Sequence, residues 1–72
     1  MWSIELVDIA GDGLIAEFET TVETLPEAEY TAVSIIQNKL HINNIRIAHY
    51  EDLIYSVWDR NNEIGAVRIR SL

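Results

Sequence analysis

The chain has 72 residues, a net charge of −7 and no cysteine. A chain of this length forms one domain near the lower size limit for a stable core, and without thiols neither disulfides nor thiolate-bound zinc can reinforce it. The charge disfavours nucleic acid and anionic membranes as partners and favours a basic protein partner.

The N-terminal segment MWSIELVDIAGDG has no basic region and is interrupted by Glu5 and Asp8. It therefore lacks the pattern of a signal peptide or of a membrane anchor. We expect a cytoplasmic protein with no membrane contact.

Residues 2–9 and 14–22 alternate between apolar and polar positions, which predicts two strands. The Gly11-Asp12-Gly13 segment between them suits a three-residue hairpin loop, because glycine accepts positive φ. This loop pairs Leu6 with Phe18 and keeps the apolar side chains of both strands on one face.

A helix is predicted from Thr24 to about residue 42. Thr24 can cap its first turn, Glu27 lies three residues later, and Pro26 is tolerated there. Apolar residues then recur at helical spacing at Ala28, Ala32, Ile35, Ile36 and Leu40. The pair Asn43-Asn44 is the expected stop.

The remaining residues predict three strands, at 44–50, 53–60 and 63–70. Two-residue turns at Glu51-Asp52 and Asn61-Asn62 place one set of side chains on the inner face: Ile45, Ile47, His49, Ile54, Ser56, Trp58, Gly65, Val67 and Ile69. The fold class is therefore α+β, a single domain over residues 1–72 with the order β-β-α-β-β-β and one helix packed on an antiparallel sheet. The order of the strands within the sheet stays open.

The segment DRNNEIG, residues 59–65, places oxygen-bearing side chains at alternate positions, as a calcium loop does. Such a loop requires glycine at its sixth position and glutamate at its twelfth, where this chain has Ile64 and Arg70. The segment is predicted to be a hairpin turn in which Arg60 and Glu63 oppose each other.

Residues for catalysis are scarce, because His41 and His49 are the only imidazoles and no cysteine can act as a nucleophile. We therefore expect no enzymatic activity, no bound metal and no cofactor. Tyr50, Tyr55 and Trp58 lie near arginines, a mixture that can mark RNA-binding sheets. The net charge argues against that alternative.

One helix covers only one face of a sheet, yet the opposite face is predicted to be rich in apolar residues. This pattern predicts self-association, as a homodimer, through that outer face. The residues expected to carry it are Val7, Ile15, Leu53, Tyr55 and Val57.

Residues 1–38 contain eight acids and no Lys or Arg, so the first hairpin is a candidate surface for a basic partner. The residues expected to form this patch are Glu5, Asp12, Glu17, Glu19 and Glu23. Glu5 is expected opposite Glu19, a like-charge pair that needs a cation. Either Arg68 or Arg70 supplies that cation from a neighbouring strand, or a second chain supplies it.

The arrangement of the GDG hairpin, the helix PEAEYTAVSIIQNKL and the closing hairpin YSVWDRNNEIGAVRI resembles small phage-encoded anti-CRISPR proteins. The resemblance implies a protein that blocks a nucleic-acid-handling complex by occluding its surface or by mimicking nucleic acid. The alternative is a structural or regulatory homo-oligomer whose open sheet face is the dimer contact.

Overall fold

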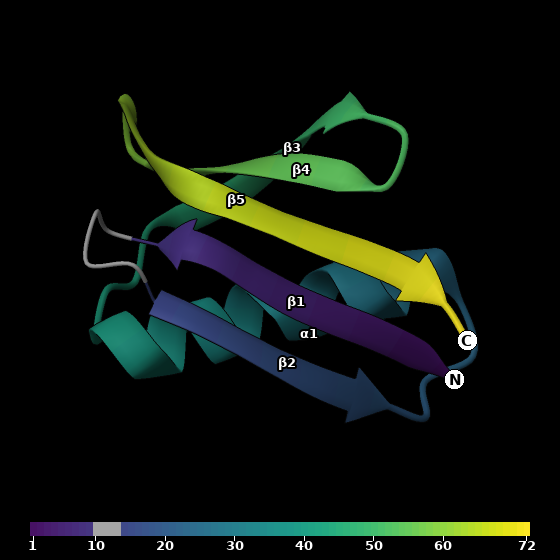
Figure 1. Ribbon diagram of the computed structural model, residues 1–72. Helices are drawn as coiled ribbons and strands as arrows, with labels where there is room; N and C mark the ends of the chain where they lie inside the picture. The colour runs from purple at the N-terminus through teal and green to yellow at the C-terminus, as the bar shows by residue number, and fades with distance from the viewer. Residues whose placement is uncertain (10–13) are drawn as a thin grey trace.

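A computed structural model describes residues 1–9 and 14–72, with the backbone alone for Leu14 and Ile15. The elements are β1 (Trp2–Ile9), β2 (Leu14–Thr20), α1 (Leu25–Leu40), β3 (Ile45–Glu51), β4 (Ile54–Asp59) and β5 (Asn62–Ser71). The strands form one antiparallel sheet in the order β2-β1-β5-β4-β3, and α1 crosses one face of it (Figure 1). The predicted α+β class and element order are confirmed.

The sheet order places β5 between the two hairpins, next to both β1 and β4. Antiparallel pairing aligns Glu5 with Arg68 and Leu6 with Val67 across the β1–β5 ladder. The acidic N-terminal hairpin therefore lies against the strand that carries two of the arginines.

Helix α1 begins where its capping residues predict. The Thr24 hydroxyl accepts a hydrogen bond from the Glu27 amide at 3.4 Å and donates to the Glu27 carboxylate at 2.9 Å. The helix buries Ala28, Ala32 and Ile36 against the sheet. It ends at Leu40 because His41 adopts the left-handed conformation, at φ 57°. The predicted stop at Asn43-Asn44 is therefore too late.

In the first hairpin, Leu6 pairs with Ala16 and Ile4 with Phe18, two residues away from the predicted register. A shift by two conserves the alternation, so the predicted faces of β1 and β2 are otherwise unchanged. The exception is Ile9, which strict strand alternation would place on the outer face with Val7 and which is instead fully buried. A bulge with Asp8 at φ 53° returns Ile9 to the core. The predicted loop at residues 11–13 lies outside the described residues.

Strand β4 is turned over relative to the sequence prediction. The β3–β4 turn is Asp52-Leu53 and the β4–β5 turn is Arg60-Asn61, each one residue away from the predicted turn. Each hairpin also contains a bulge, at the register shifts between His49 and Glu51 and between Val57 and Trp58. Each bulge shifts the register by one residue, so after the first bulge β4 presents the face opposite to the predicted one. The second bulge reverses this change, so β5, like β3, keeps its predicted face.

The core therefore contains Tyr55 and Val57 in place of the expected inner residues Ile54, Ser56 and Trp58. Val57 lies opposite Ile47 on one side and Gly65 on the other. The buried core comprises Ile4, Leu6, Ile9, Ala28, Ala32, Ile36, Ile45, Tyr55, Val57, Val67 and Ile69.

Candidate functional site

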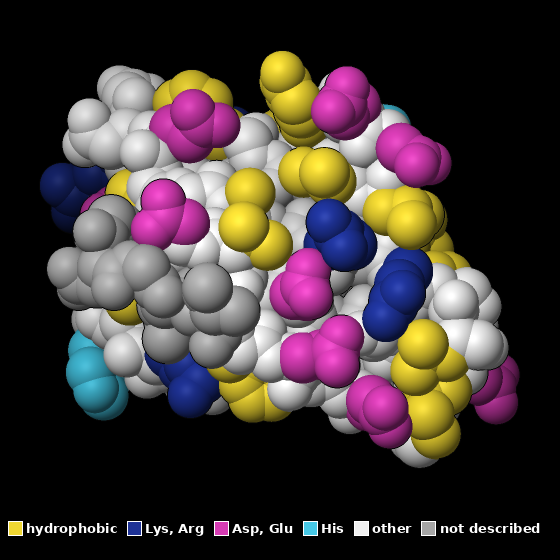
Figure 2. Space-filling view, viewed as in Figure 1, with side chains coloured by type: hydrophobic (Ala, Val, Ile, Leu, Met, Phe, Trp, Pro, Cys, Tyr) yellow, Lys and Arg dark blue, Asp and Glu magenta, His cyan; other side chains and the backbone are white. Residues whose placement is uncertain are grey.

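The sheet face opposite α1, here called the outer face, is left uncovered by the helix (Figure 1). Strand alternation and the observed registers place the following described residues on it: Glu5, Val7, Glu17, Glu19, Arg46, Ala48, Tyr50, Ile54, Ser56, Trp58, Ala66, Arg68 and Arg70. Figure 2 shows this face, where acidic and basic side chains lie side by side among exposed apolar ones.

The structure changes which residues are available for self-association. Val57 is 0% exposed and Tyr55 is 6% exposed, so their predicted position on the outer face is wrong. Leu53 is 41% exposed but lines a cleft on the helix side. Val7, at 38% exposure, is on the outer face as expected. The side chain of Ile15 lies outside the described part of the chain.

The acidic hairpin is partly neutralised by its own sheet. A Glu5 carboxylate oxygen lies 3.4 Å from an Arg68 nitrogen, and a Glu17 oxygen lies 3.7 Å from an Arg70 nitrogen. The Ser3 hydroxyl donates to the same Glu17 carboxylate at 3.2 Å. The cation that Glu5 needs is therefore Arg68 of the same chain, and the predicted Glu5–Glu19 pair is wrong because Glu5 pairs with Glu17.

Two other acids of the predicted patch remain available. Glu19 and Glu23 are exposed, and within residues 1–9 and 14–72 neither forms an ion pair with a base. Asp12 lies outside the described residues. Among the described residues of the predicted patch, the acids without an ion pair thus lie at the end of the hairpin next to α1, beyond the Glu17–Arg70 pair.

A cluster around Trp58 is the feature of the outer face that the sequence prediction missed. The Arg46 guanidinium lies 5.1 Å from the centre of the Trp58 ring, a cation–π distance. The Trp58 indole N–H donates to the Ser56 hydroxyl at 2.9 Å, which donates to the Ala48 carbonyl at 3.2 Å. These contacts hold the indole ring in a fixed orientation on the open side of the sheet.

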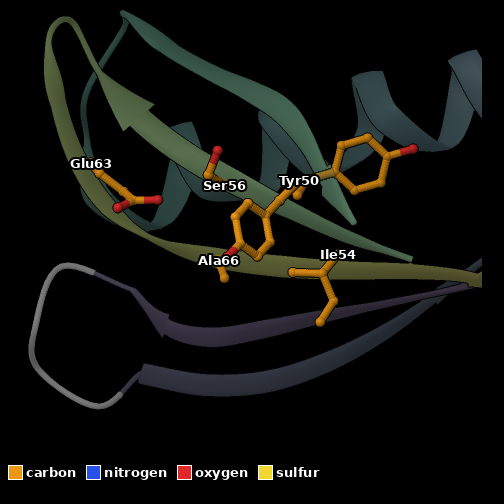
Figure 3. A pocket seen from close by; sticks show the side chains of 6 residues that line it. Tyr50, Ile54, Ser56, Glu63 and Ala66 are labelled. Carbon is orange, nitrogen blue, oxygen red and sulfur yellow. The ribbon is translucent and has the colours of Figure 1, made fainter. Parts of the chain in front are cut away.

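Beside this cluster lies a shallow hollow of about 170 Å³. Figure 3 shows Tyr50, Ile54, Ser56 and Ala66 around it, with Glu63 at one end. Tyr50 is 71% exposed, so most of its ring is available for contact. An exposed aromatic beside an apolar hollow is typical of protein-binding surfaces.

The segment DRNNEIG forms the β4–β5 hairpin, as predicted, although Glu63 pairs with Trp58 and Arg60 lies in the turn itself. Within the described residues, no three His, Asp or Glu side chains are grouped as metal ligands. No helix in the described ranges is long and apolar enough to cross a membrane.

Comparison with known proteins identifies no relative, since no family model, no curated protein and no solved structure matches the chain.

Proposed function

We propose that this protein is a small, acidic, non-enzymatic protein-binding module that contacts its partner through the outer face. The observation that carries this proposal is the uncovered side of the sheet, where Tyr50 is exposed at the hollow that Ser56 also lines and the same Ser56 orients the Trp58 ring. Aromatic and arginine side chains supply most of the binding energy at protein interfaces, and Arg46, Tyr50 and Trp58 are of these types.

We further propose a partner with a basic surface, of the kind found in nucleic-acid-handling complexes such as CRISPR effectors. The net charge of −7 supports a basic partner, and among the described residues of the acidic patch Glu19 and Glu23 form no ion pair and are exposed for contact with one. The protein would act as a phage-type inhibitor in the host cytoplasm, by occlusion or with carboxylates in the place of phosphates.

Two tyrosines provide a matched test of this surface. Tyr50 on the outer face is 71% exposed, and Tyr30 on α1 is 75% exposed. With immobilised protein, Tyr50→Ala should weaken retention of a partner by at least about tenfold, the effect of removing an interface anchor. Tyr30→Ala should leave retention unchanged. An equal loss of retention in both variants, or no loss in either, would argue against the outer face as the contact surface.

The inhibitory role is tested separately with purified CRISPR effector complexes. The protein should reduce target-DNA binding by an effector, and the Tyr50→Ala variant should do so less. If the protein leaves DNA binding by representative effectors unchanged, the role of inhibitor is rejected, although the binding module can still stand.

Self-association through the same face is the second candidate function. The outer face carries carboxylates on the edge strand β2 and an arginine on the opposite edge strand β3, so a two-fold-related copy could bring opposite charges together. Sedimentation distinguishes the candidates. A wild-type dimer that Tyr50→Ala converts to a monomer, with Tyr30→Ala still dimeric, would favour the oligomer.

A further inference from the structure

A cleft of about 370 Å³ lies on the other side of the molecule, between the first turns of α1 and the β3–β4 turn. We call it the α1 cleft. Its apolar walls are Trp2, Leu25, Leu53 and Ile69, and its polar groups are Glu29, His49, Asp52 and Tyr55. Leu25 and Leu53 are both about two-fifths exposed, at 39% and 41%, so apolar surface remains open to solvent at this cleft.

Glu29 and Tyr55 both line the cleft. Burial of the Tyr55 hydroxyl, together with its interaction with the Glu29 carboxylate, raises the pKa of Tyr55 to about 12. Tyr55 therefore stays neutral at physiological pH, so its hydroxyl is a donor on the side of the cleft that carries the carboxylate. A carboxylate has about four acceptor positions, so Glu29 can accept further hydrogen bonds from a ligand.

His49 lines the α1 cleft next to the β3–β4 turn. Its Nε2 atom lies 2.6 Å from the Asp52 carbonyl oxygen. Because a carbonyl can only accept, Nε2 must carry the hydrogen. The His49 ring also meets the Tyr55 ring edge-on, with the centres 5.3 Å apart. The His49 ring is thus positioned by contacts to both the β3–β4 turn and the buried Tyr55 ring.

The carboxylates of Glu29 and Asp52 line the α1 cleft, whereas no Lys or Arg among the described residues lines it. Three arginines lie on the outer face, Lys39 lies 5.4 Å from the Phe18 ring near the other end of α1, and Arg60 lies in the β4–β5 turn. An anionic ligand would be repelled, and an uncharged one would leave Glu29 without a counter-charge.

We propose that the α1 cleft binds a small organic cation, a primary ammonium group attached to an apolar body such as an arylalkyl group. The ammonium would donate to Glu29, and the apolar body would pack between Trp2, Leu25 and Leu53, where aromatic and aliphatic surface is exposed. This site is independent of the proposed partner surface, because it lies on the helix side of the sheet.

The test is an NMR titration of the ¹⁵N-labelled protein with phenethylammonium chloride. Saturable shifts are expected for the amides around Trp2, Glu29 and Leu53, with a dissociation constant on the order of 1 mM, as is usual for so small a ligand. The uncharged analogue 2-phenylethanol should bind about tenfold more weakly. Shifts that map to the outer face, or no saturation at about ten times that concentration, would overturn the proposal.

Two variants test the role of the carboxylate. Glu29→Gln keeps the acceptor for Tyr55 but removes the charge, so it should weaken binding by about tenfold. Glu19→Gln, which removes a charge on the outer face, should leave the affinity unchanged. Leu25→Lys places an ammonium four residues before Glu29 on α1, and this internal cation should block the ligand without requiring a change at Glu29. If the cation binds Glu29→Gln or Leu25→Lys as tightly as wild type, the site is wrong.

Discussion

Single residues with positive φ determine how the strands of this sheet turn and bulge. Asp8, Asp52 and Arg60 have φ values of 53°, 49° and 58°, although none is glycine. The left-handed conformation costs an ordinary residue about 1–2 kcal/mol. From sequence, Asn61-Asn62 was the better candidate for such a turn, and nothing in the residue types identifies Arg60 as the strained position.

Arg60→Gly should therefore stabilise the fold. Glycine removes the strain at φ 58° but adds freedom to the unfolded chain, so the free energy of unfolding should rise by up to about 1 kcal/mol. Asn61→Gly is the matched control, because Asn61 does not have positive φ. Urea unfolding of the two variants measures the difference. A gain in both, or in Asn61→Gly alone, would contradict the strain argument.

Gly65 is needed for close approach of two strands. A Cβ atom there would lie 2.8 Å from the Ile9 Cα and 2.9 Å from the Asp8 carbonyl oxygen, both backbone atoms. Gly65→Ala should therefore lower the free energy of unfolding by about 1–3 kcal/mol, the usual cost of overpacking. Ala66→Ser, whose side chain points to the outer face, should change it by less than about 0.5 kcal/mol. Similar unfolding midpoints for both variants would rule out the close contact.

Tyr55 makes stability depend on pH in the alkaline range. Its pKa rises from 10.0 in the unfolded chain to about 12 in the fold. Its contribution is complete below pH 10 and is lost as the pH rises towards 12, because the folded state resists deprotonation.

Between about pH 9 and about pH 12, the urea midpoint should thus fall more in wild type than in Tyr55→Phe, which has no phenolic proton to lose at this position. Tyr30→Phe should retain the wild-type decline, since Tyr30 is exposed on the helix. An equal alkaline decline in wild type and Tyr55→Phe would show that burial of Tyr55 does not affect its ionisation.

At the scale of the elements, the sequence predicts the helix and the β3 and β5 faces but not the face of β4. The Thr24–Glu27 cap and the apolar spacing of α1 are local signals, so they could be recognised from the sequence. The orientation of β4 depends on two bulges, which insert residues into the flanking strands. Because Tyr55 and Val57 are apolar but so are Ile54 and Trp58, alternation alone does not decide between the two faces.

The ion pairs across β2, β1 and β5 predict different effects for neighbouring charge reversals. Glu17→Lys would place an ammonium beside Arg70, whose nitrogen lies 3.7 Å from the Glu17 carboxylate. The expected loss is about 0.5–1 kcal/mol at low salt, and it should shrink as salt screens the repulsion. Glu19→Lys should change stability by only a few tenths of a kcal/mol. Urea unfolding of the two variants at low and high salt measures both losses of stability, and equal losses would exclude a specific Glu17–Arg70 contact.

At the scale of the whole molecule, an uncovered outer face could be predicted because the sequence predicts a single helix. Which residues lie on that face could not be predicted. Val57 was expected to take part in a dimer contact, and it is instead in the core. The Arg46–Trp58 stack depends on the orientation of β4, and the α1 cleft depends on the unpredicted strand order that brings Trp2 and Ile69 beside the β3–β4 turn.

Val57→Glu should therefore unfold the protein and not merely separate a dimer. A carboxylate without a partner in the core should lower the free energy of unfolding by more than about 3 kcal/mol. Circular dichroism and amide dispersion should show the loss of structure. A folded Val57→Glu monomer would contradict the position of this residue in the core.

The position of β5 at the centre of the sheet has a consequence for how the chain folds during synthesis. The β1–β2 and β3–β4 hairpins contact each other through β5, which follows both hairpins in the chain and is therefore synthesised after them. Two-stranded hairpins are at best marginally stable in water. The nascent chain therefore gains its cooperative structure only after β5 has emerged, and until then the two hairpins expose the strand edges that β5 later joins.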